Sequence, residues 1–228
     1  MHELRRQIAE SIARYLGGVK PRFPVFDFRH IPANKLKHFA PGQDIVSIST
    51  IKADHAMNLL IKAIEFAADK HRNQRRKDAD ASPYINHPIA LANVLANEAG
   101  VDDEKVLMAA ILHDTIEDTD TTSRELEEVF GDEIAAIVLE VTDDMLLPKD
   151  ERKRLQIEHA STISESAKLV KLADKICNLR DVADNSPTHW KLERRRQYFE
   201  WAKAVVDELR GVHPKLEQLF DAAYRNKP

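Results

Sequence analysis

Apolar residues recur at intervals of three and four along most of the chain beyond residue 53. This spacing places them on one face of an α-helix. Clear examples lie in residues 53–71, 164–179 and 190–210, where leucine, isoleucine, valine and aromatic residues form the apolar face. No segment alternates apolar and polar residues for long enough to predict a strand. The pattern therefore predicts an all-α fold, a compact bundle of many helices.

Capping residues, glycines and prolines mark where these helices begin and end. Gly100 suits the end of a helix that begins near Pro88, and either Asp102 or Asp103 can cap the next helix. The other predicted helices follow the capping box Thr122-x-x-Glu125 to Phe130, continue over 132–142, run from Pro148 to about Ala160, start at Ser164, and span Trp190 to Arg210 and Pro214 to Tyr224.

The first 50 residues differ in composition from the rest. Apolar residues at helical spacing predict a short helix within 1–20, and Gly17 and Gly18 end it. Four prolines among isolated aromatics then predict an extended, loop-rich arm over 21–50. The expected organisation is an N-terminal extension, 1–50, and one compact domain, 51–228. The extension is expected to be an accessory segment, packed on the main body or joining copies of the chain into a homo-oligomer.

Charge and composition narrow the class of protein. The chain has 228 residues, of which 43% are hydrophobic, enough for a sizeable core. A net charge of −4 gives no indication of bulk nucleic-acid binding. The single cysteine, Cys177, excludes an internal disulfide and favours a reducing compartment, so a cytoplasmic location is expected. No apolar run approaches the roughly 18 residues of a membrane span.

The stretch Leu107–Asp118 changes from apolar to polar partway along. Leu107 to Leu112 can enter the core, and then His113, Asp114, Glu117 and Asp118 follow. In a continuous helix, residues three and four apart share a face, so Glu117 is expected one turn from His113 and Asp114. A His-Asp pair at the polar end of a buried helix is a candidate for half of a metal site.

Two other positions can supply the remaining ligands. His87 directly precedes Pro88, and Asp174 interrupts an otherwise apolar helix face. Taken alone, His87 reads as a capping or surface residue, and Asp174 as an ion-pair partner of a neighbouring lysine. Together with His113 and Asp114 they form a set of two imidazoles and two carboxylates. Such a set suits a divalent ion such as Mn²⁺ with open positions for water and substrate, and its lack of thiolates argues against structural zinc.

Four sequence blocks carry a resemblance to a known family. They are His71-Arg-Asn-Gln-Arg-Arg-Lys-Asp78, Pro83-Tyr-Ile-Asn-His-Pro88, Ala110-Ile-Leu-His-Asp-Thr-Ile-Glu-Asp-Thr119 and Lys168-Leu-Val-Lys-Leu-Ala-Asp-Lys-Ile-Cys-Asn-Leu-Arg180. In this order they resemble the HD-domain phosphohydrolases, and more closely the hydrolase half of RelA/SpoT-type alarmone enzymes. No synthetase half is present, so the chain resembles the small alarmone hydrolases, including the metazoan type. The resemblance covers residues 55–210.

The resemblance implies a Mn²⁺-dependent enzyme that removes pyrophosphate from the 3′ position of ppGpp and pppGpp, giving GDP and GTP. It implies that Glu117 and Asp118 orient or activate the attacking water. The implied metal ligands are His87, His113, Asp114 and Asp174. The residues implied to bind the nucleotide are Arg76, Lys77, Lys149, Asn178, Arg194 and Tyr198. Arg76 is expected to stack on the base and Asn178 to lie near the ribose.

Other readings of the same residues remain open. The basic loop around Arg76 suits several phosphorylated nucleotides, so an NADPH 2′-phosphatase or a (p)ppApp hydrolase with the same site is an alternative. A non-catalytic nucleotide sensor is a third hypothesis, and the complete set of ligand and acidic residues argues against it. His71 is expected to be structural or to support the site from outside, and Cys177 to serve packing.

Overall fold

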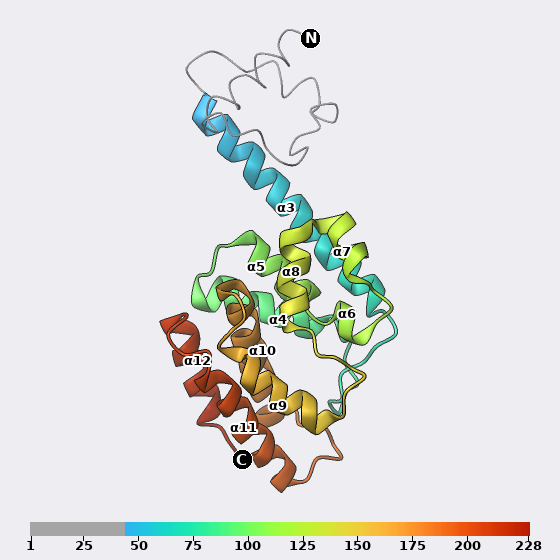
Figure 1. Ribbon diagram of the computed structural model, residues 1–228, viewed down its shortest axis with the longest axis vertical. Coiled ribbons are helices and arrows are strands. Elements are labelled where there is room, and N and C mark those ends of the chain that lie inside the picture. The colour runs from blue at the N-terminus through green and yellow to red at the C-terminus, as the bar shows by residue number, and fades with distance from the viewer. Residues whose placement is uncertain (1–43) are drawn as a thin grey trace. The chain divides into compact units, whose positions relative to one another are not determined.

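The computed structural model describes the backbone of residues 44–228 and side chains from His55 onward. Within this part of the chain every regular element is a helix, and strand-like pairing is confined to one isolated bridge between Arg75 and Pro83. The predicted all-α class is confirmed (Figure 1). The predictions for residues 1–43 lie outside the described residues. No helix in the described part is long and apolar enough to span a membrane.

The helices follow one another along the chain, joined by short loops except for the connection 71–85 (Figure 1). They are α3 (Asp44–Lys70), α4 (Asn86–Asn93), the π-helical turn η2 (Val94–Ala99), α5 (Glu104–Leu112), α6 (Thr115–Asp118), α7 (Ser123–Phe130), α8 (Asp132–Val141), α9 (Lys149–Ala160), α10 (Glu165–Asp184), α11 (Leu192–Asp207) and α12 (Pro214–Tyr224).

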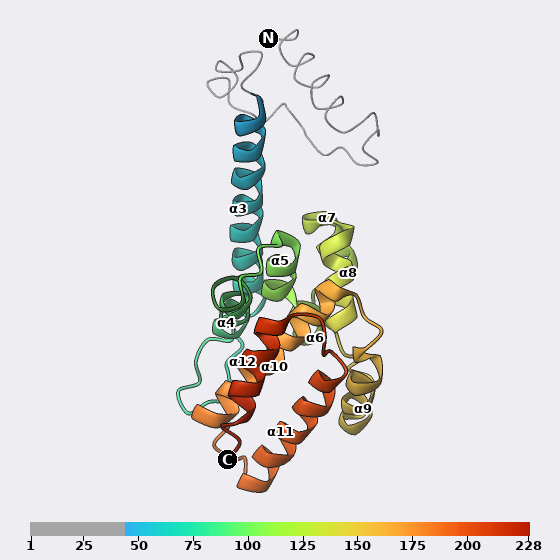
Figure 2. The same ribbon diagram turned by 90° about the vertical axis from the view of Figure 1, so that its left-hand side faces the viewer.

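Helix α10 lies at the centre of the bundle. It contacts α4, α5, α8, α11 and α12, and α12 runs along its side in both views (Figures 1 and 2). Its apolar residues, among them Val170, Leu172, Ile176 and Leu179, are fully buried. A helix that is buried around most of its circumference organises a core rather than covering one. Any polar side chain on α10 that faces inward is therefore held rigidly.

The predicted caps are present. Asp103, Thr122 and Ser164 each accept a hydrogen bond from a backbone N–H group in the first turn of the following helix. Gly100 ends η2 with φ of 80°, a left-handed conformation that glycine adopts without a steric penalty. The choice that the sequence left between Asp102 and Asp103 is settled in favour of Asp103.

The boundaries of two predicted helices were wrong. Helix α3 begins at Asp44 rather than Ala53, so the last residues of the predicted loop-rich extension are helical. The sequence from 43 to 82 contains neither glycine nor proline, so nothing in it stops a helix from starting earlier. Helix α11 spans Leu192–Asp207 rather than the predicted 190–210, and Lys191 before it is still extended with ψ of 157°.

The sequence predicted one continuous helix over Leu107–Asp118, but the structure has a break within this stretch. Helix α5 ends at Leu112, and Asp114 has φ of −97° and ψ of −1° before the short helix α6. The Thr115 hydroxyl donates to the carbonyl oxygen of Leu112 at 2.6 Å, satisfying a group that the end of α5 leaves free. This break lies at the residues that form the centre of the site.

Candidate active site

A cleft of about 540 Å³ opens beside α10. Its lining comes from the connection 71–85, from α4, α9 and α11, and from the break between α5 and α6. All the site residues predicted from the sequence line this cleft, except Lys77 and Asp118. Four sequence blocks that are far apart in the chain therefore meet in one place.

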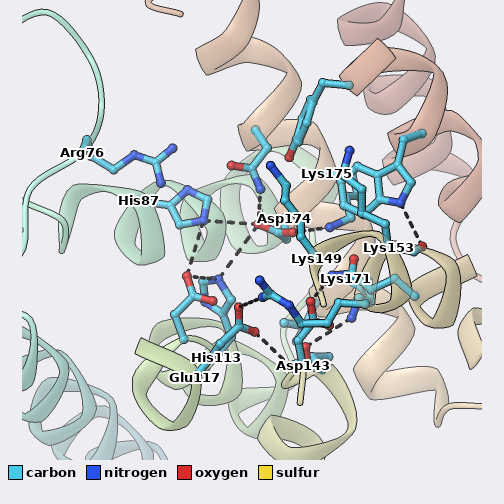
Figure 3. Close-up of a pocket in the computed structure, with 18 of the residues that line it drawn as sticks. Arg76, His87, His113, Glu117, Asp143, Lys149, Lys153, Lys171, Asp174 and Lys175 are labelled. Carbon is cyan, nitrogen blue, oxygen red and sulfur yellow. Dashed lines mark hydrogen bonds and ion pairs between the residues drawn. The ribbon is translucent and has the colours of Figure 1, made fainter. Parts of the chain in front are cut away.

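The imidazoles of His87 and His113 and the carboxylate of Asp174 converge in the cleft (Figure 3), and the Asp114 carboxylate adjoins them. One ligand atom from each of His87, His113 and Asp174 lies within 4.8 Å of the other two. The Nε2 atom of His87 is 3.2 Å from Oδ1 of Asp174. The Oδ2 atom of Asp114 is 2.9 Å from His113 Nε2 and 4.0 Å from His87 Nε2. These are the four residues predicted as metal ligands.

The chemistry of His113 fits a metal ion at this position. Its Nδ1 lies 2.8 Å from the carbonyl oxygen of Ala110, which can only accept, so Nδ1 carries a proton. In the neutral ring Nε2 then offers its lone pair toward the carboxylates. This nitrogen is buried and has no well-aligned hydrogen-bond partner among the described residues. A histidine oriented in this way by a carbonyl is typical of metal ligands.

The charges of the cluster also call for a cation. Burial alone would lower the pKa of His113, but Asp114 and Asp174 outweigh it and raise that pKa to about 9. Burial likewise opposes ionisation of Asp114, yet His113 holds the Asp114 pKa below its usual range. Two ionised carboxylates in a buried site therefore attract either a proton on His113 or a bound cation, which would displace that proton.

Neighbouring side chains orient the two carboxylates. The Tyr84 hydroxyl donates to Oδ2 of Asp114 at 2.5 Å. The amide of Asn178 donates to Oδ1 of Asp174 at 2.5 Å, and the Lys175 ammonium donates to Oδ2 at 3.0 Å. Asn178, predicted to lie near a ribose, thus lines the cleft while its amide N–H supports a metal-type ligand. Such outer contacts fix the direction of ligand lone pairs.

Glu117 lies in the cleft beside this cluster (Figure 3). One of its oxygens accepts a hydrogen bond from the backbone N–H of Asp143 at 3.0 Å, and the Arg152 guanidinium lies 3.9 Å from the other. Burial, followed by the charge of Asp114, raises the pKa of Glu117 to about 7. A carboxylate with a pKa near neutrality is suited to exchange protons with water.

Asp118 occupies a different position from Glu117. It does not line the cleft, and its Oδ2 accepts a hydrogen bond from the side chain of Gln74 at 2.8 Å. The backbone N–H of Asp118 donates to the carbonyl oxygen of Asp114 at 2.9 Å, so one turn of helix links the two carboxylates as the sequence spacing predicted.

Basic side chains form another part of the cleft wall. Arg76, Lys149 and Arg194 line it, while Lys77 is exposed nearby and its charge contributes to lowering the pKa of Lys149. Arg76 pairs with Asp181, and its guanidinium lies 5.6 Å from the centre of the Tyr84 ring. A group of cations with few counter-charges is a binding surface for phosphates.

Sequence reasoning missed several residues of this wall. Lys153, Lys171 and Lys175 all line the cleft. A signal was available, because Lys153 follows Lys149 by four residues and Lys175 follows Lys171 by four, so each pair shares a helix face. Burial, and then the charge of Lys149, lowers the pKa of Lys153, which reflects the crowding of positive charge.

Two residues were predicted to have no chemical role in the cleft. His71 is 2% exposed and contacts Gln74 rather than the metal-type cluster. Cys177 is buried, and burial raises the pKa of its thiol to about 12, so the group stays protonated near neutral pH. Both placements agree with supporting or packing roles.

Most of the helical domain matches a known protein family. A family model described as the HD domain matches residues 63–199, more than half of the chain. The chain belongs to the HD-domain family. The match begins within α3 and ends within α11, so it contains the whole cluster of His87, His113, Asp114 and Asp174.

Relatives within the HD-domain family are similar over most of their length. Guanosine-3′,5′-bis(diphosphate) 3′-pyrophosphohydrolase MESH1 from Danio rerio is 55% identical over 166 residues, covering 71% of this chain and 92% of the relative. The Homo sapiens protein of the same name is 53% identical over 168 residues, covering 74% and 94%. The resemblance to small alarmone hydrolases of the RelA/SpoT family is confirmed, and this HD-domain chain is a phosphohydrolase.

A solved structure agrees with these relatives. It belongs to a protein described as a metazoan ortholog of SpoT that hydrolyzes ppGpp, and it is 53% identical to this HD-domain chain. The TM-score is 0.72, and the match covers 73% of this chain and 94% of the other. The predicted fold is therefore that of a known hydrolase.

Proposed function

We propose that the protein is a Mn²⁺-dependent (p)ppGpp 3′-pyrophosphohydrolase. The observation that carries this proposal is the cluster of two histidines and two aspartates in a cleft that is also lined by basic side chains. The names of the relatives support the same substrate. A nucleotide with two diphosphates needs both groups of side chains. The cluster serves the reacting phosphate, and the basic side chains serve the negative charges of the other phosphates.

His87, His113, Asp114 and Asp174 would hold the ion. Their mixture of imidazole and carboxylate donors suits Mn²⁺. When bound, such an ion lowers the pKa of a water ligand and neutralises charge on phosphoryl oxygens. Tyr84 and Asn178 keep the carboxylates pointed at the cluster, through the hydrogen bonds described above.

The remaining side chains divide the work of hydrolysis. Water attacks the phosphorus attached to the 3′ oxygen, and the bond from this phosphorus to the 3′ oxygen breaks. The 3′ oxygen leaves with the nucleoside and takes up a proton from solvent, which balances the proton that the attacking water loses. Glu117 takes a proton from the attacking water, and Asp118 assists Glu117. Arg76 stacks on the base, while Lys77, Lys149, Arg194 and Tyr198 bind the phosphates and Asn178 lies toward the ribose. Pyrophosphate and GDP, or GTP from pppGpp, are the products.

A comparison of three nucleotides tests the proposed substrate. Purified protein with Mn²⁺ is expected to release pyrophosphate from ppGpp faster than from ppApp, and faster than it releases phosphate from NADPH. The measurement is kcat/KM for each nucleotide, with a metal-chelated sample as the control. A higher kcat/KM for NADPH or ppApp would assign the site to that nucleotide instead. No turnover of any of the three would overturn the proposed function.

We also propose that the protein is cytoplasmic, since its single cysteine suits a reducing compartment. Cell fractionation tests the location.

We further propose that the N-terminal segment acts in assembly, separately from the catalytic domain that begins near residue 51. The segment lies outside residues 63–199, which the family model matches. Removing residues 1–43, which leaves α3 whole, is expected to lower the mass in solution and preserve kcat. Unchanged mass would contradict the assembly role.

A further inference from the structure

The side chain of Gln74 joins two residues that the proposed reaction does not otherwise connect. Its Nε2 donates to Oδ2 of Asp118 at 2.8 Å, and its Oε1 lies 2.6 Å from Nδ1 of His71. Gln74 precedes Arg76 by two residues in the connection between α3 and α4, whereas Asp118 ends α6. The contact therefore spans two blocks of the sequence that are 44 residues apart.

Hydrogen-bond polarity allows only one arrangement of this chain of groups. An ionised carboxylate accepts and cannot donate, so the amide nitrogen of Gln74 must face Asp118. Its amide oxygen then faces His71, and the His71 Nδ1 must carry the proton that this oxygen accepts. His71 is 2% exposed, which anchors the inner end of this chain of groups, whereas the contact between Gln74 and Asp118 is open to solvent. Turning the amide over would break both hydrogen bonds at once.

The backbone around Gln74 is held as firmly as its side chain. Its N–H donates to the carbonyl oxygen of His71 at 2.9 Å, and its own carbonyl accepts from the N–H of Tyr84 at 3.2 Å. The ring of Tyr84 lies 4.8 Å from that of His71, and the Tyr84 hydroxyl reaches Asp114. One connecting segment thus holds a metal-type ligand through Tyr84 and the second acidic residue through Gln74.

We propose that Gln74 is a positioning residue for hydrolysis, which fixes the direction of the Asp118 carboxylate while His71 fixes the direction of the Gln74 amide. This inference rests on the proposed function, in which Asp118 assists Glu117. It adds that the segment carrying Arg76 to the nucleotide also orients Asp118. Substrate binding and water handling then share one structural support.

Gln74→Glu tests the proposal with little change in size. The new carboxylate would face that of Asp118 and repel it. Loss of this hydrogen bond, together with the new repulsion, is expected to lower kcat by roughly 10-fold. KM and Mn²⁺ affinity should change by less than about threefold, since Gln74 is proposed to contact neither the nucleotide nor the ion. Gln218→Glu, at an exposed position of α12, makes the same chemical change away from the cleft and should leave kcat unchanged.

A double-mutant cycle separates positioning from general structural damage. In an Asp118→Asn background, Gln74→Glu should cost no further kcat, because the group through which it acts is already altered. The proposal is overturned if Gln74→Glu keeps the wild-type kcat. It is equally overturned if the loss is as large in the Asp118→Asn background as in the wild type. Thermal unfolding of each variant shows whether it has folded.

A second measurement does not depend on turnover. The side-chain amide signal of Gln74 in a ¹⁵N spectrum, assigned through its loss in Gln74→Ala, is expected to shift in Asp118→Asn. An unchanged signal would overturn the contact on which the inference rests. If the wild type hydrolyses none of the three nucleotides, the proposed function fails, while the amide signal still decides whether Gln74 holds Asp118.

Discussion

A protein carrying both Glu117→Gln and Asp118→Asn is expected to lose turnover but keep Mn²⁺ and nucleotide binding. Loss of a general base typically lowers kcat by about 10²- to 10⁴-fold. Glu117 lines the cleft, and burial together with Asp114 raises its pKa to about 7, so it can exchange a proton near neutral pH. The substituted amides have nearly the same shape and cannot take that proton. Steady-state kinetics give kcat, and calorimetry gives the affinities for Mn²⁺ and for the nucleotide.

The matched control is Glu127→Gln with Glu128→Gln, which removes the same two charges from exposed positions of α7. This control should retain kcat and Mn²⁺ affinity, since exposed ion pairs contribute little to stability. A full rate in the Glu117 and Asp118 variant would show that another group handles the water. Lost Mn²⁺ binding in that variant would place the acidic pair within the ion site instead.

Asp174→Asn is expected to abolish Mn²⁺ binding and lower kcat/KM by about 10³-fold or more, since metal ions supply several kcal/mol of charge stabilisation in phosphoryl transfer. Asp174 is within 4.8 Å of both histidine ligand atoms and comes from the rigid central helix. Lys175 donates to the same carboxylate, so the variant also leaves a buried ammonium group without its full partner. Some loss of thermal stability is expected for that reason.

Metal-dependent stability distinguishes loss of the ion from loss of the fold. At an ion concentration of about 100 Kd, a ligand that binds the folded state alone raises the free energy of unfolding by about 2.7 kcal/mol. The wild type should show this rise with Mn²⁺, and Asp174→Asn should not. Asp184→Asn, at the exposed end of the same helix, should behave as the wild type. An equal rise in the Asp174 variant would remove Asp174 from the ligand set.

Local signals in the sequence were sufficient for most of the helices. The caps at Asp103, Thr122 and Ser164 depend on a side chain and the next turn of backbone, so nearby residues decide them. The beginning of α3 was predicted wrongly, because neither glycine nor proline marks it. The predicted metal ligands could also be identified from the sequence, because each stands in a short block whose order along the chain carries the resemblance.

The sequence alone therefore identified the all-α class, the family and the four residues that meet in the cleft, since helical periodicity and short motifs are local properties of the chain. Tertiary structure decided the break at Asp114, the separate surroundings of Glu117 and Asp118, and the contact from Gln74 to Asp118. Distances between residues far apart in sequence depend on how α10 and its neighbours pack. No periodicity reports such distances, so the supporting contacts became visible only in the folded chain.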